Sequence, residues 1–124
     1  MNANDTIFAL ATPYAKSGVA VIRLSGGRAL PALSALTEKI DWTPNMARYV
    51  AFRGPDGTVI DNGLALFFQS PRSFTGEDVV ELHTHGSIGV IREMLEVLGN
   101  MDGLRHAEPG EFTKRAFLNA KMDL

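Results

Sequence analysis

The sequence predicts an α+β domain with a mixed, mostly antiparallel sheet and about three helices. Short apolar runs of strand character follow one another closely, and the turn signal Pro55-Asp56-Gly57 joins two of them. Other segments repeat apolar residues at helical spacing. The chain has 124 residues, which fits one domain over 1–124.

The first third of the chain predicts two strands and a helix. Residues 5–11 have strand propensity and stop at the turn signal Thr12-Pro13. A second strand covers residues 19–24, and its apolar residues on both faces predict that it is covered on both sides. Ser25-Gly26-Gly27 ends this strand, and the leucine spacing that follows predicts a helix over about 28–36.

The middle of the chain predicts a hairpin. Strands over residues 47–53 and 58–68 flank the Pro55-Asp56-Gly57 turn, in which proline presets one φ angle and glycine accepts a positive one. Asn62-Gly63 interrupts the second of these strands and marks a bulge or a second turn. Residues 69–78 then form a loop.

The last third predicts two more strands and two helices. A strand over residues 79–85 precedes Ser87, which can cap a helix running to about residue 98. A short strand over residues 104–107 and a helix over about 111–118 complete the chain. The order β-β-α-β-β-β-α-β-α places consecutive strands next to short turns, which favours antiparallel pairing.

Composition excludes several classes of protein. Apolar residues make up 45% of the chain and charged residues 21%, which argues against general disorder. Twelve Lys and Arg stand against fourteen Asp and Glu, so the net charge of −2 argues against a domain that binds nucleic acid by bulk charge. The absence of cysteine excludes disulfides, thiol nucleophiles and thiolate metal sites.

The chain gives no sign of export or membrane insertion. The first residues have no basic segment ahead of their apolar stretch, as a signal peptide would. The longest apolar runs are far shorter than the roughly 20 residues that span a bilayer. We therefore expect a cytoplasmic protein without a membrane partner.

The densest cluster of ionisable residues lies in the strand over residues 79–85. In a strand, Glu81, His83 and His85 project from one face. Two imidazoles at this spacing can both ligate a divalent metal ion, but a tetrahedral site needs further ligands. The same pattern is typical of a polar strand end at a surface or interface.

Glu81 also suits a different kind of binding. A carboxylate has two acceptor oxygens and can receive two parallel N–H bonds from a planar N–C–N edge, such as that of a pterin, a guanine or an arginine. Phe74, Phe112 and Phe117 are candidate apolar walls for such a pocket. Alternatively, Glu81 forms a surface ion pair of little energetic weight.

No nucleotide-binding loop is present. The pattern G-x-x-x-x-G-K-[ST], which cradles phosphates, occurs nowhere in the sequence. Thr75-x-x-Asp78 matches a capping box, but the residues after it alternate with period two, so a helix there is not expected.

The segment 108–121 has the pattern of an amphipathic helix whose charges suit the helix dipole.

Several segments together resemble the N-terminal domain of the MnmE (TrmE) family of tRNA-modification GTPases. They occur in family order and cover nearly the whole chain. The matching stretches are Asp5-Thr6-Ile7, Ala11-Thr12-Pro13, Val21-Ile22-Arg23-Leu24-Ser25-Gly26, Ser73-Phe74-Thr75-Gly76-Glu77-Asp78-Val79-Val80-Glu81, His85-Gly86, Glu108-Pro109-Gly110-Glu111-Phe112-Thr113-Lys114-Arg115-Ala116-Phe117-Leu118-Asn119 and Lys121-Met122-Asp123-Leu124.

The resemblance implies a function that the composition alone does not indicate. Family members place this domain ahead of a helical domain with an inserted Ras-like GTPase domain, both of which would follow Leu124. The N-terminal domain is similar to the folate-binding domain of the glycine-cleavage aminomethyltransferase. It binds a reduced folate of the 5-formyl-tetrahydrofolate type and forms a homodimer.

The resemblance also implies partners and site residues. With the FAD enzyme MnmG, the full protein uses GTP, Mg²⁺ and K⁺ to add a carboxymethylaminomethyl-type group to carbon 5 of the wobble uridine of certain tRNAs. The family's folate contacts fall on Arg23, Glu81 and Lys121, with no catalytic residue and no metal ligand in this domain. From their chemistry, Glu81 accepts from the pterin's amino-pyrimidine edge, and Arg23 and Lys121 donate to ligand oxygens.

Two other functions remain open from the residues alone. One is a stand-alone metal-dependent hydrolase that uses His83 and His85. The other is a module that only mediates assembly, with its pocket closed or empty.

Overall fold

A computed structural model describes residues 4–119 as one sheet with three helices. Within this range the elements follow the predicted order. They are β1 (Thr6–Leu10), β2 (Ser17–Ser25), α1 (Ala29–Thr37), β3 (Arg48–Arg53), β4 (Val59–Phe68), β5 (Val79–Gly86), α2 (Ile88–Gly99), β6 (Leu104–His106) and α3 (Glu111–Leu118).

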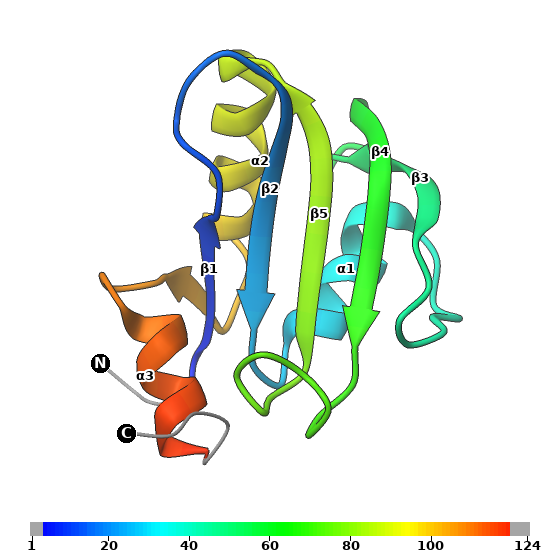
Figure 1. Cartoon of the computed structure of the whole chain (residues 1–124). Coiled ribbons are helices and arrows are strands. Elements are labelled where there is room, and N and C mark those ends of the chain that lie inside the picture. Colours follow the sequence, from blue (N-terminus) through cyan, green and yellow to red (C-terminus); the bar gives the residue numbers. More distant parts are fainter. Residues whose placement is uncertain (1–3, 120–124) are drawn as a thin grey trace.

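The sheet is mixed and mostly antiparallel, as the sequence predicts. Its strand order is β3-β4-β5-β2-β1-β6, and only the pairing of β1 with β6 is parallel. β2 and β5 lie in the middle of the sheet, each between two other strands (Figure 1). The two strands that carry Arg23 and Glu81 are therefore direct neighbours.

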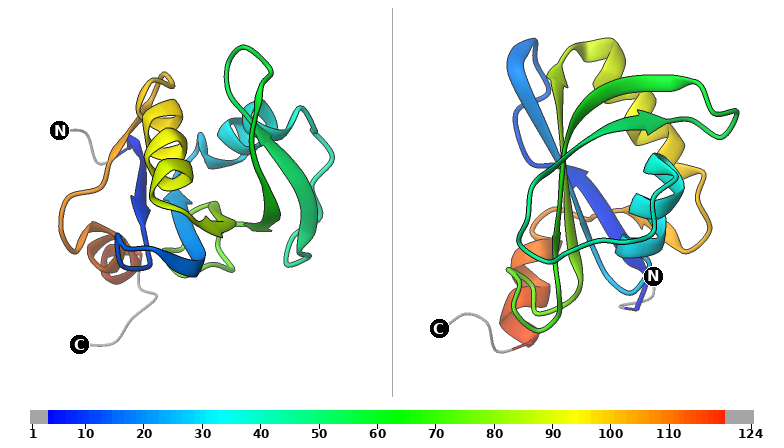
Figure 2. Two further views of the ribbon diagram at one scale, coloured as in Figure 1. Left: turned by 90° about the horizontal axis from the view of Figure 1, so that it is seen from above. Right: turned by 90° about the vertical axis from the view of Figure 1, so that its right-hand side faces the viewer.

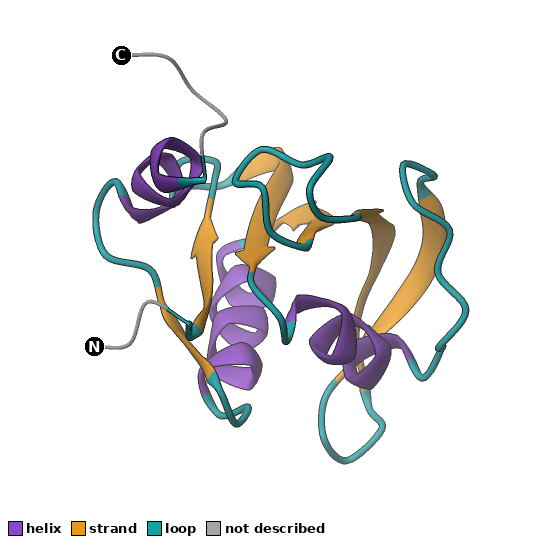
Figure 3. Ribbon diagram, turned by 90° about the horizontal axis from the view of Figure 1, so that it is seen from below, coloured by secondary structure: helices purple, strands orange, loops and turns teal. Residues whose placement is uncertain are grey.

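The helices divide between the two faces of the sheet. α1 and α2 cover one face, and α3 lies on the opposite side, below and beside β1 (Figures 2 and 3). The main core forms under α1 and α2, where inward residues of the strands meet Leu33, Leu36, Met94 and Leu98 of the helices. Among residues 4–119, no helix covers the far face of the sheet above α3.

This arrangement corrects one expectation about β2. On its helix side, Ala20, Ile22 and Leu24 are fully buried. On the other face Val19 is 56% exposed and Val21 is partly exposed, so β2 is not covered on both sides. The second face of this strand therefore carries partly exposed apolar residues together with Arg23.

The hairpin of β3 and β4 also differs in one detail. Asn62-Gly63 does not interrupt β4, and the irregularity in pairing lies between Phe52 and Arg53 instead. Gly63 is required for close packing, because a Cβ there would collide with the backbone carbonyl of His83 on β5. The turn between the two strands forms as expected, with Gly57 at φ +84°.

Two possible helix caps were present in the sequence, one at Thr75 in the loop before β5 and one at Ser87 after β5. The capping-box match at Thr75 forms no helix, because its hydroxyl bonds to Ser25 and accepts the Glu77 amide instead. Ser87 does cap α2, accepting from the amide of Val90. β5 therefore runs without interruption from the loop to the start of α2.

Candidate functional site

The uncovered face of the sheet presents two rows of residues that register across the strands. One row is Tyr49, Leu64, His83 and Val21, on β3, β4, β5 and β2 in turn. The next row is Leu66, Glu81, Arg23 and Ala9, on β4, β5, β2 and β1. We call these two rows the open face. Its polar groups lie in the centre, with apolar residues on both sides.

Arg23 and Glu81 form an ion pair at the centre of the open face. The Nε and Nη2 atoms of Arg23 donate to Glu81 Oε2 at 3.1 and 3.0 Å. Their side chains are 30% and 20% exposed, so a ligand can approach both. The guanidinium also lies 5.6 Å from the ring centroid of Phe74, a cation–π contact. The sequence separates the two residues by 58 positions, and only the pairing of β2 with β5 brings them together.

The two histidines of β5 have different carboxylate partners. His83 Nε2 lies 3.1 Å from Glu81 Oε1. His85 Nδ1 lies 2.9 Å from Asp61 Oδ1, and the His85 amide donates to Asp61 Oδ2 at 2.8 Å. Burial alone would raise the pKa of Asp61, but the hydrogen bonds from His85 outweigh it and hold the pKa below its usual value.

These contacts do not assemble a metal centre. Among residues 4–119, no group of three or more His, Cys, Asp or Glu side chains is arranged to hold a metal ion. His83 and His85 bond to separate carboxylates, and His85 is 71% exposed at its side chain. The metal-dependent hydrolase hypothesis gains no support from this part of the chain.

A buried network of charges holds α3 in place. Both oxygens of Glu111 accept from Arg105, at 2.8 and 2.7 Å, and the carboxylate also accepts from Arg115 Nη2 and from the Glu108 amide. These bonds, above all those from Arg105, lower the pKa of Glu111 from 4.5 to about 2. Arg105 further bonds to Asp5 at 3.1 Å. The network ties α3 to the strands β1 and β6.

The same network reaches the loop that carries Phe74. Arg115 Nη1 donates to both oxygens of Glu77, at 3.1 and 3.2 Å. Glu77 accepts from Ser25 at 2.6 Å, and Ser25 is in turn 2.6 Å from the Thr75 hydroxyl. Ser25 and Thr75 are fully buried. The loop beside the Arg23–Glu81 pair is thus fixed by α3 and by the end of β2.

A depression of about 430 Å³ adjoins the open face at β1. It is lined by ten residues from β1, from the loop after it, from the end of β6, from the loop that joins β6 to α3 and from the start of α3: Ala9, Leu10, Thr12, Tyr14, His106, Ala107, Glu108, Pro109, Gly110 and Phe112. Ala9 is the register partner of Arg23, so this depression lies next to the ion pair. Its volume is within the range of small-molecule sites.

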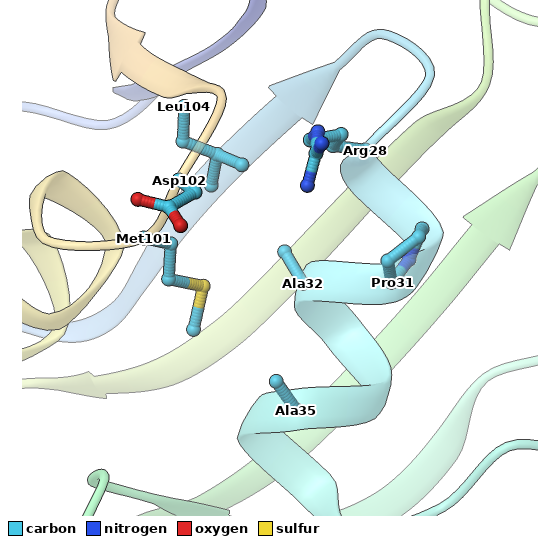
Figure 4. Close-up of a pocket in the computed structure, with 7 residues that line it drawn as sticks. All are labelled: Arg28, Pro31, Ala32, Ala35, Met101, Asp102 and Leu104. Carbon is cyan, nitrogen blue, oxygen red and sulfur yellow. The ribbon is translucent and has the colours of Figure 1, made fainter.

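A second depression lies on the other face of the sheet. It has a volume of about 210 Å³ between α1 and the segment that joins α2 to β6. Figure 4 shows Arg28, which precedes α1, and Ala32 and Ala35 of α1 on one side, with Met101, Asp102 and Leu104 on the other. The sheet separates it from Glu81, so it takes no part in the candidate site.

The structure brings together part of the residue set expected from the sequence. Arg23 and Glu81 are paired, and Phe74 lies against Arg23. Phe112 lines the adjoining depression, whereas Phe117 is 43% exposed on α3. Lys121 lies outside the described residues.

Sequence reasoning missed the residues that support the site. The partners of Glu77 and Glu111 were not expected, and neither was the contact between His83 and Glu81. The ion pair between Glu111 and Arg115 could have been predicted, because the two residues are four positions apart in a predicted helix, a spacing that favours pairing.

Comparison with known proteins decides the family. A family model described as "GTP-binding protein TrmE N-terminus" matches residues 6–121. The chain belongs to this family. No helix within residues 4–119 is both long and apolar enough to cross a membrane.

Two relatives are similar to this chain over nearly its whole length. The chain is 54% identical over 121 residues to the "tRNA modification GTPase MnmE" of Parvibaculum lavamentivorans, covering 97% of this chain and 28% of that protein. It is 49% identical over 127 residues to the protein of that name from Mesorhizobium japonicum, covering 100% of this chain and 28% of the relative. The chain therefore spans about a quarter of the length of these relatives.

Proposed function

We propose that this domain binds a reduced folate of the 5-formyl-tetrahydrofolate type and forms a homodimer, as the N-terminal part of a tRNA-modifying GTPase. The observation that carries the proposal is the partly exposed Arg23–Glu81 pair on the open face, beside Phe74 and an adjoining depression. The similarity to proteins named tRNA modification GTPase MnmE supports the wider role.

The chemistry of the pair suits a pterin. Glu81 is an acceptor for the N–C–N edge of the amino-pyrimidine ring, which presents two parallel N–H groups. Within the described residues, Arg23 uses two of its five N–H donors on Glu81, so three others can reach ligand oxygens. Phe74 offers a ring face at the edge of the site.

Lys121 is the third residue of the proposed site. Its ammonium group would donate to the formyl, carbonyl or glutamate-tail oxygens of the ligand. The position lies outside the described residues, and its role rests on the resemblance to the family alone. We assign no catalytic residue and no metal ligand to this domain.

Homodimerisation fits the exposed apolar residues on the open face and beside it. Tyr49 is 71% exposed, Val19 56%, Phe74 45% and Leu64 41%, although all four are large apolar residues. Contiguous exposed apolar surface on a soluble domain marks an interaction site. A second copy of the chain is the partner that the family resemblance implies.

The remaining functions belong to the whole protein of which this family forms the N-terminal part. GTP hydrolysis with Mg²⁺ and K⁺, cooperation with the FAD enzyme MnmG, and modification of the wobble uridine of tRNA in the cytoplasm are proposals by similarity. The chain has no phosphate-cradling loop, so we assign nucleotide binding to the remaining length of such proteins.

Calorimetric titration with 5-formyl-tetrahydrofolate tests the folate assignment. Glu81→Gln keeps the size of the side chain but replaces one acceptor oxygen with a donor. Because hydrogen bonds to charged groups contribute about 1.5–3 kcal/mol, we expect affinity to fall by roughly tenfold or more. Charge reversal by Glu81→Lys should abolish binding while far-ultraviolet circular dichroism stays unchanged.

Glu93→Gln and Glu93→Lys are matched controls for these variants. Glu93 is exposed on α2, which covers the other face of the sheet, so folate affinity should stay at the wild-type value. Unchanged affinity in Glu81→Lys would contradict the proposed site. Dimers that bind no folate would favour the assembly-only function instead.

Sedimentation equilibrium tests the dimer. Leu64→Glu places a charge beside the exposed Tyr49 on the open face, and we expect it to shift the chain toward the monomer. Glu96→Lys, an exposed change on α2, should leave the dimer unchanged. A Leu64→Glu dimer as tight as wild type would exclude the open face as the interface.

A further inference from the structure

His83 stands where it can compete with a ligand for Glu81. Its Nε2 atom lies 3.1 Å from Glu81 Oε1, and its side chain is 30% exposed. Its register partners on the neighbouring strands are Val21 and Leu64, which offer no polar side-chain group. Glu81 is therefore the polar group that the imidazole contacts on this face.

A ligand that pairs with both oxygens of Glu81 meets an existing partner at each of them. Oε2 already accepts two N–H bonds from Arg23, and Oε1 is in contact with His83. A planar N–C–N edge needs both carboxylate oxygens at once. Arg23 can keep one bond to Glu81 while a ligand binds, because it has five donors, and the ligand must share Oε1 with His83 or displace it.

We propose that His83 is a pH-dependent competitor of folate for Glu81. This rests on the proposed function of the domain. When the imidazole is protonated, it holds Oε1 by a charge-assisted bond, which is roughly twice as strong as a neutral one. When it is neutral, the bond is weaker and the ligand displaces it more easily. Folate affinity therefore rises with pH, and binding at mildly acidic pH releases a proton from His83 to the solvent.

The other ionisable groups around His83 do not replace it in this role. On β5, His85 is held by Asp61 of β4. On β2, Arg23 donates two hydrogen bonds to Glu81. On β3, Tyr49 lies beyond Leu64 in the same row.

The test is calorimetric titration of the chain with 5-formyl-tetrahydrofolate at about pH 6 and about pH 8, values that bracket the usual range of imidazole titration. Each titration is repeated in two buffers with different heats of ionisation, which reports the number of protons released. We compare wild type with His83→Gln, which cannot titrate, and with His85→Gln, the matched control on the same strand.

The wild-type chain should bind roughly tenfold more tightly at the higher pH, because one proton is exchanged for the ligand. His83→Gln should bind with nearly equal affinity at both pH values and release no proton. His85→Gln should behave as wild type, because its imidazole contacts Asp61 and not Glu81.

Two results would overturn the inference while leaving folate binding in place. In the first, His83→Gln keeps the wild-type pH dependence and proton release. In the second, His83→Gln binds at least tenfold more weakly at both pH values, which makes His83 a direct ligand contact. Absence of binding by wild type at either pH would instead refute the proposed function, and the competitor role with it.

Discussion

Replacement of Glu111 by glutamine should destabilise the domain in a pH-dependent way. The carboxylate accepts four hydrogen bonds, two from Arg105, one from Arg115 and one from the Glu108 amide. Its side chain is 9% exposed, so solvent screens these bonds little. Glutamine approximates the protonated carboxyl group in size and removes the negative charge between two guanidinium groups.

The lowered pKa of Glu111 sets the expected magnitude. Hydrogen bonds from Arg105 are the largest cause of its fall from 4.5 to about 2. At roughly 1.4 kcal/mol per unit of pKa, this corresponds to about 3 kcal/mol of stability. Because the pKa is lower in the folded than in the unfolded chain, the contribution is fully present above about pH 5. It is lost as the pH falls toward 2.

Urea unfolding of wild type and Glu111→Gln at several pH values measures this effect. We expect a difference of about 3 kcal/mol in the free energy of unfolding near neutral pH, shrinking steadily toward pH 2. Glu108→Gln is the matched control, since this exposed neighbour contributes only its backbone amide to the network. A difference in the free energy of unfolding below about 1 kcal/mol at neutral pH would refute the reasoning, and so would a difference that does not change with pH.

Two further predictions concern β4. Gly63→Ala should lower stability by more than about 2 kcal/mol in urea unfolding, because its Cβ would collide with the His83 carbonyl and force β4 from β5. Gly89→Ala, at an open helix position, should be neutral or slightly stabilising, and similar losses in both variants would argue against the collision. Asp61→Asn should cost less than about 1 kcal/mol, because its partner His85 is exposed. Since bonds from His85 keep the pKa of Asp61 low despite burial, that small difference should be fully present above about pH 4 and decline as the pH falls through the lowered pKa; a constant difference would contradict this origin.

Local sequence signals predicted the elements well but not their neighbours in space. The alternation of Leu82 with Glu81 and His83, and the cap at Ser87, depend on residues close in the chain. The position of β2 between β1 and β5 depends on which apolar faces fit together across the whole sheet. No local pattern determines that choice, so the uncovered face of β2 was not expected.

In the candidate site, too, local features were predictable from the sequence, whereas contacts between distant residues were not. The chemistry of Glu81 was readable from its residue type, and the resemblance to a family supplied Arg23 as its companion. The pairing itself follows from the register of β2 and β5, which aligns the two charged residues among apolar neighbours. The support from Arg115 and Glu77 crosses 38 residues of sequence and was not readable at all.

The contacts between α3 and the loop before β5 explain why these two segments, distant in the sequence, contribute to one site. Glu111 orients Arg115, Arg115 holds Glu77, and Glu77 is bonded to Ser25 at the end of β2. Asn119 adds a bond from the end of α3 to the carbonyl of Thr75. The loop fixed in this way carries Phe74 to the guanidinium of Arg23. α3 is therefore linked to the Arg23–Glu81 pair through this loop, and we expect a change at the buried charges of the helix to alter the edge of the site.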